Sequence, residues 1–340
     1  MICSPESSAW SGAVPSEMKI LFIRKSSLGD IIHAIPAFYE LRDAFPDAEI
    51  HWAVAPAGAQ ILEHIGGIDR IRSISQGFLR GLRHDRFDLA IDLQGLLKTA
   101  VMARLAGQRR YGFARGHTRE PFCQLFYTDT VFPTGVHIID KNISLIASVT
   151  GRPRSTGPYR FGELLSEEDI STVDEQLSSA GISPGYVLLN PGAGWKNKQW
   201  SPLKFGELAK RLSGHRVALV SYSPAERPLA ERVVRASEGA ARLAPSTSFM
   251  GFGALAARSA LVVSGDTGPM HFACAMGVRI LGLFAPTSPF RNGPWNPGDR
   301  FIIASTRCDF CWKRSCPWEN CIDKIEVDQV LRLIEEMLES

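Results

Sequence analysis

The chain has 340 residues, of which 45% are hydrophobic and 21% charged, a composition typical of a folded protein long enough for two domains. Its net charge of +3 is too small to indicate nucleic-acid binding, and no run of about 18 apolar residues is present to span a membrane. Four of the seven cysteines crowd into residues 308–321 instead of forming a dispersed disulfide framework, which favours a reducing, cytoplasmic setting.

The N-terminal stretch, residues 1–17, is rich in Ser and Pro and lacks the long apolar core of a secretory signal. An apolar run then begins abruptly at Met18 and predicts the first strand. We therefore expect residues 1–17 to be a disordered extension and Met18 to be the biological start. The alternative is that the stretch forms a short docked arm.

From Met18 onward, short apolar runs alternate with amphipathic stretches, the pattern of βαβ units. The predicted strands are 19–24, 49–54, 69–74, 87–92, 109–113, 186–190, 216–221, 260–264 and 279–284. The helices predicted between most of them are 30–44, 57–65, 95–106, 202–213, 225–236, 249–258 and 268–276. Several strands are continuous apolar runs, which are typical of parallel strands covered on both faces, so the sequence predicts an α/β fold.

The alternation is interrupted once, over residues 151–166, where prolines and glycines precede the helix-start signature at Ser166. We place the linker there and predict a first domain over 18–160 and a second over 161–325. The remaining residues, 326–340, are predicted to form a final helix. Ligands of doubly wound α/β domains bind at the carboxyl ends of the strands, so two such domains facing each other would create a ligand-binding cleft.

The first chemical motif follows the first predicted strand and reads RKSSLGD over residues 24–30. Gly29 permits a tight turn, and Asp30 would lie at a helix N-terminus, where a negative charge is stabilised. Asp30 is therefore either a helix cap or a general base that accepts the proton of a hydroxyl group. Two basic residues and two serines, Ser27 among them, favour the functional interpretation.

The second motif reads NPGAGWKNKQW over residues 190–200 and follows the first strand of the second domain. Glycines followed by lysines and a helix beginning near Pro202 suit a phosphate site, because backbone N–H groups and a lysine charge would face the anion. The candidates are Gly194 and Lys198. The Gly-Lys-Ser/Thr ending of a P-loop is missing, and an ordinary Gly-rich turn is the alternative.

The third motif reads SGDTGPMH over residues 264–271, where a strand ends and a helix begins. Thr267 and Gly268 can offer backbone N–H groups at that helix N-terminus, and His271 lies one turn into the helix. His271 is either a packed core residue or a ligand contact. The Asp-Thr-Gly triplet does not indicate an aspartic protease, because those enzymes are rich in β structure and this motif opens a helix.

Residues 80–120 carry nine Arg or Lys residues against four acidic ones, a local excess larger than the net charge of the whole chain. The stretch is either an ordinary solvated face or a surface for a polyanionic acceptor or an anionic membrane leaflet.

The cysteine-rich segment has the spacing Cys308-x2-Cys311-x4-Cys316-x4-Cys321. Four thiols within fourteen residues could enclose a zinc ion, but the spacing is irregular for paired zinc knuckles. Reduced or loosely paired thiols are the alternative, and the sequence leaves the choice open.

Taken together, these motifs make the chain resemble glycosyltransferase family 9, the ADP-heptose:lipopolysaccharide heptosyltransferases, from Met18 to the C-terminus. The most specific marks are residues 25–30, 92–98 and 265–271. The segments 119–121 and 125–127 look most like the heptosyltransferase I branch. The Gly-rich segment at 191–195 departs from that branch, whose members carry hydroxyl residues there.

The resemblance implies a GT-B architecture, two Rossmann-like domains facing a central cleft, in which residues 326–340 form a helix crossing back to the first domain. It implies Asp30 as the general base and Ser27, Lys98 and Arg119 as acceptor contacts. The donor residues that it implies are Gly194, Lys198, Glu226, Thr247, Asp266, Thr267, Gly268 and His271. Lys198 would meet the diphosphate, Glu226 the ribose and Thr247 the adenine.

From this resemblance we expect an inverting transfer of L-glycero-D-manno-heptose from ADP-heptose to the Kdo region of a lipopolysaccharide inner core. The scheme requires no metal and no cofactor. The expected partners are an ADP-sugar, a lipid A–Kdo acceptor and the anionic inner face of the cytoplasmic membrane, where the enzyme would be a peripheral protein, and no nucleic acid. The alternatives are a transferase of the same fold with another donor or acceptor, and a non-catalytic, metal-stabilised nucleotide-binding protein.

Overall fold

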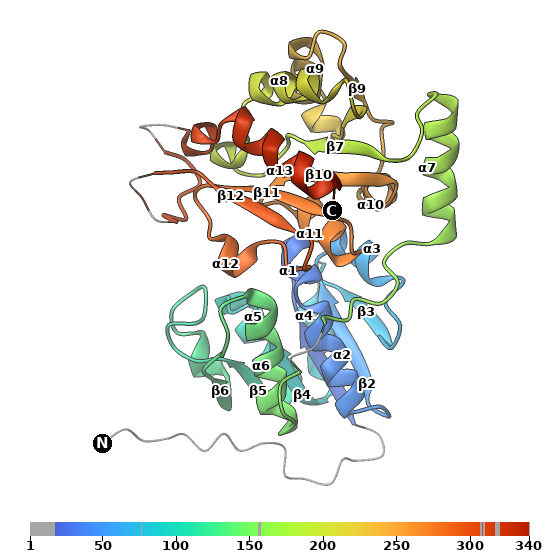
Figure 1. Ribbon diagram of the computed structural model, residues 1–340. Helices are drawn as coiled ribbons and strands as arrows, with labels where there is room; N and C mark the ends of the chain where they lie inside the picture. The colour runs from blue at the N-terminus through green and yellow to red at the C-terminus, as the bar shows by residue number, and fades with distance from the viewer. Residues whose placement is uncertain are drawn as a thin grey trace. The chain divides into compact units, whose positions relative to one another are not determined.

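A computed structural model describes residues 18–75, 77–155, 158–306, 308, 310–316 and 320–339. The chain divides into two compact units, Met1–Leu164 and Leu165–Ser340, a few residues beyond the boundary predicted at 160. The predicted extension over residues 1–17 lies outside the described residues. Each unit contains one parallel six-stranded sheet (Figure 1).

The first unit alternates strands and helices in the predicted manner. Its strands are β1 (Lys19–Ile23), β2 (Glu49–Val54), β3 (Arg70–Ser73), β4 (Phe87–Asp92), β5 (Gly107–Phe113) and β6 (Asp129–Val131). Its helices are α1 (Leu28–Ile32), α2 (Ile35–Ala44), α3 (Pro56–Leu62), α4 (Phe78–Asp85), α5 (Leu97–Ala106), the 3-10 helix η1 (Cys123–Phe126) and α6 (Ile138–Thr150).

The second unit repeats the alternation after α7 (Glu167–Ser179). Its strands are β7 (Tyr186–Asn190), β8 (Ala218–Val220), β9 (Ala241–Leu243), β10 (Ser259–Gly265), β11 (Ile280–Phe284) and β12 (Arg300–Ile303). The connecting helices are η2 (Lys196–Lys198), α8 (Pro202–Leu212), η3 (Pro224–Glu226), α9 (Arg227–Ala236), α10 (Phe249–Ala257), α11 (Gly268–Ala275), α12 (Pro289–Asn292), η4 (Cys321–Lys324) and α13 (Val327–Glu339).

Both sheets have the strand order of a Rossmann fold. The first runs β3-β2-β1-β4-β5-β6, and the second runs β12-β11-β10-β7-β8-β9, which is the same order counted from its own first strand. The order reverses between β1 and β4 in the first unit and between β7 and β10 in the second. Ligands of open α/β sheets bind at the carboxyl ends of the strands beside such a reversal, so each unit has one defined place for a ligand.

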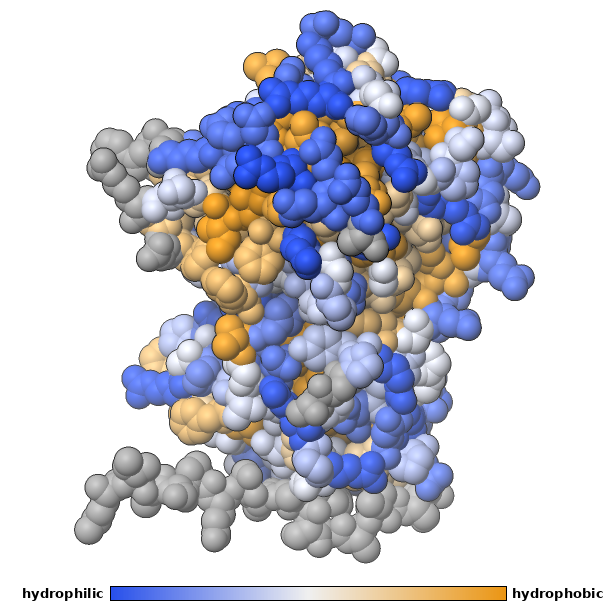
Figure 2. All heavy atoms as spheres, in the orientation of Figure 1, coloured by the Kyte–Doolittle hydropathy of each residue, from blue (hydrophilic) through white to orange (hydrophobic). Residues whose placement is uncertain are grey.

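The cores explain why the apolar runs could be recognised in the sequence. The central strands β1 and β7 are buried over nearly their whole length, because helices cover both faces of each sheet. Helix α9 buries only one side, where Ala230 and Val233 face inward, whereas α10 is buried over nearly its whole length. On the face drawn in Figure 2, the outward residues over α8 and α9 are mainly hydrophilic.

Residues 326–340 were expected to form a final helix that crosses back to the first domain, and the helix is present as α13 (Val327–Glu339). Helix α13 belongs to the second unit, and its apolar residues Val330, Ile334 and Met337 join the core formed by β7, β10 and α8. Arg279 also donates a hydrogen bond to the carbonyl oxygen of Met337. The amphipathic pattern that predicted the helix is therefore used to complete the second unit.

Within the described residues, no helix is both long and apolar enough to cross a membrane.

Candidate active site

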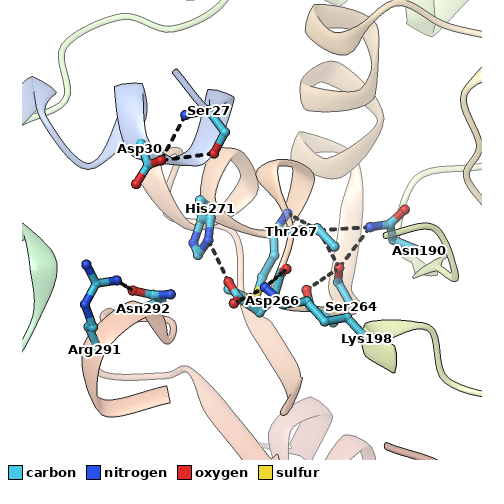
Figure 3. Close-up of polar contacts among 12 residues, drawn as sticks. Ser27, Asp30, Asn190, Lys198, Ser264, Asp266, Thr267, His271, Arg291 and Asn292 are labelled. Atoms are coloured by element: carbon cyan, nitrogen blue, oxygen red, sulfur yellow. Dashed lines mark hydrogen bonds and ion pairs between the residues drawn. The ribbon is translucent and has the colours of Figure 1, made fainter. Parts of the chain in front are cut away.

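Asp30 lies where the first sheet reverses its strand order, just after β1. Ser27 is the N-cap residue of α1, and its backbone N–H donates to Asp30 Oδ2 at 2.9 Å (Figure 3). The Ser27 hydroxyl lies 3.2 Å from the same oxygen. Asp30 therefore acts as part of a helix cap, and this cap uses only the Oδ2 oxygen of its carboxylate.

Two guanidinium groups contact the same carboxylate. Arg24 Nη2 lies 2.7 Å from Oδ1, and Arg119 Nη2 lies 2.8 Å from Oδ2. Burial raises the pKa of Asp30, but the charges of Arg24 and Arg119 outweigh it and lower the pKa to about 2. The Arg24 side chain is 3% exposed and that of Arg119 is 48% exposed, so the buried cation is fixed and the other is open to solvent.

A buried turn at the end of β4 holds these groups in place. Asp92 accepts hydrogen bonds from the Tyr127 hydroxyl at 2.8 Å and from the backbone N–H of Gln94 at 2.8 Å. The Gln94 side-chain oxygen accepts from Ser26 N–H, and the Gly95 carbonyl accepts from Arg119 N–H at 3.0 Å. The motif 92–98, in which only Lys98 was given a role from the sequence, therefore connects the Asp30 turn to the Arg119 loop.

Lys98 lies in the first turn of α5 and lines a cavity of about 520 Å³ in the first unit. Lys25 and Arg80 line the same cavity, with Phe78 and Met102 on its apolar side. None of these three cations makes an ion pair with a described residue. A cavity with three unpaired positive charges is suited to an anionic ligand.

In the second unit, hydrogen bonds join the ends of β7 and β10 across the reversal. Asn190 Nδ2 donates to Ser264 Oγ at 2.9 Å and to Thr267 Oγ1 at 3.3 Å (Figure 3). Thr267 is the N-cap residue of α11, and its hydroxyl accepts from the backbone N–H of Met270. Gly268 is the first residue of this helix, so its N–H belongs to the unpaired donors of the helix N-terminus.

Asp266 links Lys198 and His271 beside that helix N-terminus. Lys198 Nζ lies 2.6 Å from Oδ2 of Asp266, and His271 Nε2 lies 3.0 Å from Oδ1. Burial raises the pKa of Asp266, but the hydrogen bond with His271 and the charge of Lys198 outweigh it and hold the pKa well below its usual value. The lysine predicted for a diphosphate is thus held by a buried carboxylate.

Glycines allow the predicted loops to pack closely. A Cβ atom on Gly265 would lie 2.6 Å from the Lys198 carbonyl oxygen, so only glycine lets this loop lie on β10. A Cβ atom on Gly192 would lie 2.2 Å from Glu226 Oε1, which places Glu226 beside the Gly-rich turn. Gly194 has open space where a Cβ would lie, and its backbone is accessible to a ligand.

Thr247 lies farther along the same edge of the sheet, after the edge strand β9. It lines a cavity of about 230 Å³ together with Ser166, Asp169 and Ser248. The structure thus brings Lys198, Asp266 and His271 into direct contact, places Glu226 against the Gly-rich turn, and leaves Thr247 in a separate cavity. Sequence reasoning gave no role of their own to Arg24 and Asn190, although each ends a predicted strand and begins one of the quoted motifs.

The cysteine-rich segment gives no support to a metal centre in the part of the chain that the structure describes. Cys308 is exposed, and Cys311 is half-buried. No group of three or more His, Cys, Asp or Glu side chains that could hold a metal ion is present in that part.

Comparison with known proteins gives one consistent family. Residues 76–322 match the model of glycosyltransferase family 9 (heptosyltransferase). Lipopolysaccharide heptosyltransferase 1 of Pseudomonas aeruginosa is 30% identical over 326 residues, covering 89% of this chain and 88% of that protein. Lipopolysaccharide heptosyltransferase 1 of Escherichia coli K12 is 26% identical over 295 residues, covering 80% of this chain and 89% of that protein.

Two solved structures show the same fold. The structure of E. coli heptosyltransferase WaaC with ADP has a TM-score of 0.73 at 23% identity and covers 95% of this chain and 98% of that one. E. coli ADP-heptose lps heptosyltransferase II has a TM-score of 0.75 at 21% identity, with coverages of 95% and 99%. This likeness confirms the fold predicted from the sequence, a GT-B protein with two Rossmann-like α/β domains.

Proposed function

The chain belongs to glycosyltransferase family 9, and we propose that it moves L-glycero-D-manno-heptose from ADP-heptose to the Kdo region of a lipopolysaccharide inner core, with inversion at the anomeric carbon. The observation that carries this proposal is a relative named lipopolysaccharide heptosyltransferase 1 that matches over nearly the whole length of both chains. The contacts of Asp30 and Lys198 supply the chemistry that such a transfer needs.

In this proposal the donor binds at the β7–β10 reversal of the second unit. The ADP diphosphate is met by Lys198, by the backbone of Gly194 and by the N–H groups at the start of α11, which stabilise the charge that develops on the leaving group. Glu226 contacts the ribose, and Thr247, in its own cavity farther along the sheet edge, contacts the adenine. Thr267 and His271 complete the donor site beside Asp266.

Asp30 takes the proton from the acceptor hydroxyl as the oxygen attacks the anomeric carbon. A carboxylate with a pKa of about 2 is always ionised in the cell, but it is a weak base while both arginines hold it. An anionic acceptor that draws the half-exposed Arg119 away would raise the pKa of Asp30 at the moment of reaction. Arg24 is buried and remains in place.

The acceptor would bind to the first unit through its anionic groups. Lys98, with Lys25 and Arg80, offers unpaired positive charge in the 520 Å³ cavity, and Ser27 and Arg119 lie at the Asp30 carboxylate. The same excess of cations favours peripheral association with the anionic cytoplasmic face of the membrane, where such a lipid acceptor would lie.

Mass spectrometry of products formed from ADP-heptose and a Kdo–lipid A acceptor tests the proposal. We expect one added heptose, and we expect Asp30→Asn to lower kcat by roughly 10²–10⁴ while ADP still binds. Ser201→Ala, which removes the hydroxyl cap of α8, is a control for minor structural change. Near-normal turnover of Asp30→Asn would reduce Asp30 to a helix cap.

A second candidate is a transferase of the same family that uses another nucleotide sugar. The segment 191–195 favours this second candidate, because the segment offers backbone groups where the resemblance led us to expect hydroxyl side chains. Competition between ADP-sugars and UDP-sugars for transfer decides between the two donors.

A further inference from the structure

The segment 310–316, part of the cysteine-rich region, connects two loops at the carboxyl edge of the second sheet. Trp312 N–H donates to the Pro286 carbonyl at 2.9 Å, just after β11. Asn197 Nδ2, in the loop after β7, donates to the Lys313 carbonyl at 2.7 Å. Asn197 is buried, so the contact that fixes residue 313 against the Lys198 loop is shielded from water.

Aromatic contacts strengthen the same connection. The guanidinium carbon of Arg291 lies 5.2 Å from the centre of the Trp312 ring, and the rings of Phe290 and Phe310 are 6.4 Å apart. The segment is therefore attached both to the loop that carries α12 and to the loop that carries Lys198.

This attachment brings a second cation to the Lys198 loop. The Arg314 guanidinium carbon lies 5.7 Å from the centre of the Trp195 ring, and Lys198 Nζ lies 4.3 Å from the centre of the same ring. The two cations differ in their partners. Lys198 is paired with Asp266 at 2.6 Å, whereas Arg314 is exposed and makes no ion pair with a described residue.

We propose that Arg314 binds the diphosphate of the nucleotide donor, as a cation additional to Lys198. The inference rests on the proposed function only in taking the Lys198 loop as the diphosphate site. Asp266 offsets most of the Lys198 charge, while a nucleoside diphosphate carries more than one negative charge, so a second cation is needed nearby. The planar fork of arginine suits two phosphate oxygens at once, and the Trp195 ring holds the guanidinium close to the loop before the ligand arrives.

The proposal gives the cysteine-rich segment a role that its spacing did not reveal. Residues 310–316 deliver Arg314 to the donor loop through the Asn197–Lys313 hydrogen bond. The hydrogen bond from Asn197 reaches the carbonyl oxygen of Lys313, and the Lys313 side chain forms no ion pair with a described residue. Adjacent residues of equal charge therefore have different predicted effects, which makes them a matched pair.

Calorimetric titration of the full chain with ADP and with adenosine tests the proposal. We expect Arg314→Ala to weaken ADP binding about tenfold, because a charge-assisted phosphate contact is lost, and to leave adenosine binding unchanged. Lys313→Ala should stay within about twofold of wild type for both ligands, since Lys313 contacts the Lys198 loop through its carbonyl oxygen, which the substitution keeps. Arg314→Lys should recover part of the ADP affinity, as it keeps the charge without the fork.

Asn197→Ala tests the delivery of Arg314 separately. This variant should bind ADP more weakly than wild type, as Arg314→Ala does. The double variant should bind ADP no more weakly than the single variant with the lower ADP affinity. Equal ADP affinity in Arg314→Ala and wild type would overturn the proposal. An equal loss for adenosine would also overturn it, because the effect would then not come from phosphate.

Titration with UDP beside ADP separates this inference from the proposed function. If wild type binds UDP more tightly than ADP, the proposed donor is wrong, and the effect of Arg314→Ala is then read on UDP against uridine. If ADP binds more tightly and Arg314→Ala changes nothing, the donor assignment stands and the role of Arg314 is refuted.

Discussion

Removal of Arg24 should show how strongly this buried cation lowers the pKa of Asp30. We consider Arg24→Met, which keeps the length of the side chain and removes its charge. In the wild type the Arg24 guanidinium contacts Asp30 Oδ1 at 2.7 Å and also donates to the Leu93 carbonyl. The variant therefore leaves a nearly buried carboxylate with Arg119 as its remaining cation.

The expected magnitude follows from the pKa of Asp30, which is lowered from 3.8 to about 2. A group with a depressed pKa stabilises the fold above its unfolded pKa and loses that contribution as the pH falls through the folded value. The net lowering corresponds to about 2 kcal/mol of folding free energy at pH 7. Because burial opposes the arginines, loss of Arg24 should cost more than this, about 3 kcal/mol, as for other broken buried pairs.

Two measurements follow, with Arg119→Ala as the comparison. Chemical denaturation at pH 7 should give a loss of about 3 kcal/mol for Arg24→Met and about 1 kcal/mol or less for Arg119→Ala, whose guanidinium is half exposed. The acid limb of kcat/KM should move to higher pH in Arg24→Met, because burial then raises the pKa of Asp30 with less opposition. An unmoved acid limb together with an unchanged free energy of unfolding would refute this account of Asp30.

Two further predictions concern the substrates. Lys198→Ala should weaken ADP binding in calorimetric titration by about tenfold, with the exposed neighbour Lys196→Ala as the control, and equal affinities would place the diphosphate elsewhere. The double variant Lys98→Ala with Arg119→Ala should raise the acceptor KM and keep the ADP affinity. It should also weaken binding to anionic vesicles, in a salt-dependent manner. Loss of ADP affinity with an unchanged acceptor KM would reverse the assignment of the two substrates to the two units.

The central strands could be predicted because a strand buried on both faces requires a continuous run of apolar residues. Strands β1, β2, β4, β7 and β10 all lie where such runs predicted them. Three of the four edge strands, β6, β9 and β12, were missed, because fewer side chains need to be apolar at a sheet edge; the fourth, β3, was predicted at 69–74. Helix α4 was also missed, since Leu82 is its only buried residue.

The site could be predicted only as far as local signals reach. Asp30 and Lys198 lie in the short segments that follow β1 and β7, and the residues around them suggest anion chemistry. Their partners are distant in the sequence: Arg119 is 89 residues from Asp30, and Asp266 is 68 residues from Lys198. Those pairs depend on which strands become neighbours in each sheet, and no local pattern encodes that order.

Asp30 pairs with Arg119, and Asp266 pairs with Lys198, so each carboxylate holds a cation that an anionic ligand would also attract. The competition between Asp266 and the ligand for Lys198 can be measured. Asp266→Asn removes the charge that pairs with Lys198 and keeps the shape of the side chain. The free energy of unfolding should fall by about 3 kcal/mol at pH 7, because Lys198, whose side chain is only 12% exposed, loses its partner. The difference from wild type should be complete above about pH 4 and shrink at lower pH, since the pKa of Asp266 is depressed in the folded protein.

The same variant should bind ADP more tightly than wild type, because the diphosphate no longer competes with the carboxylate for the Lys198 ammonium and instead replaces it. The increase in melting temperature caused by ADP should accordingly be larger in Asp266→Asn than in wild type. If the variant binds ADP more weakly, Asp266 aims Lys198 at the phosphates and does not compete with them. Charge at the site would then matter less than the orientation of the lysine, which the carboxylate fixes together with its contact to His271.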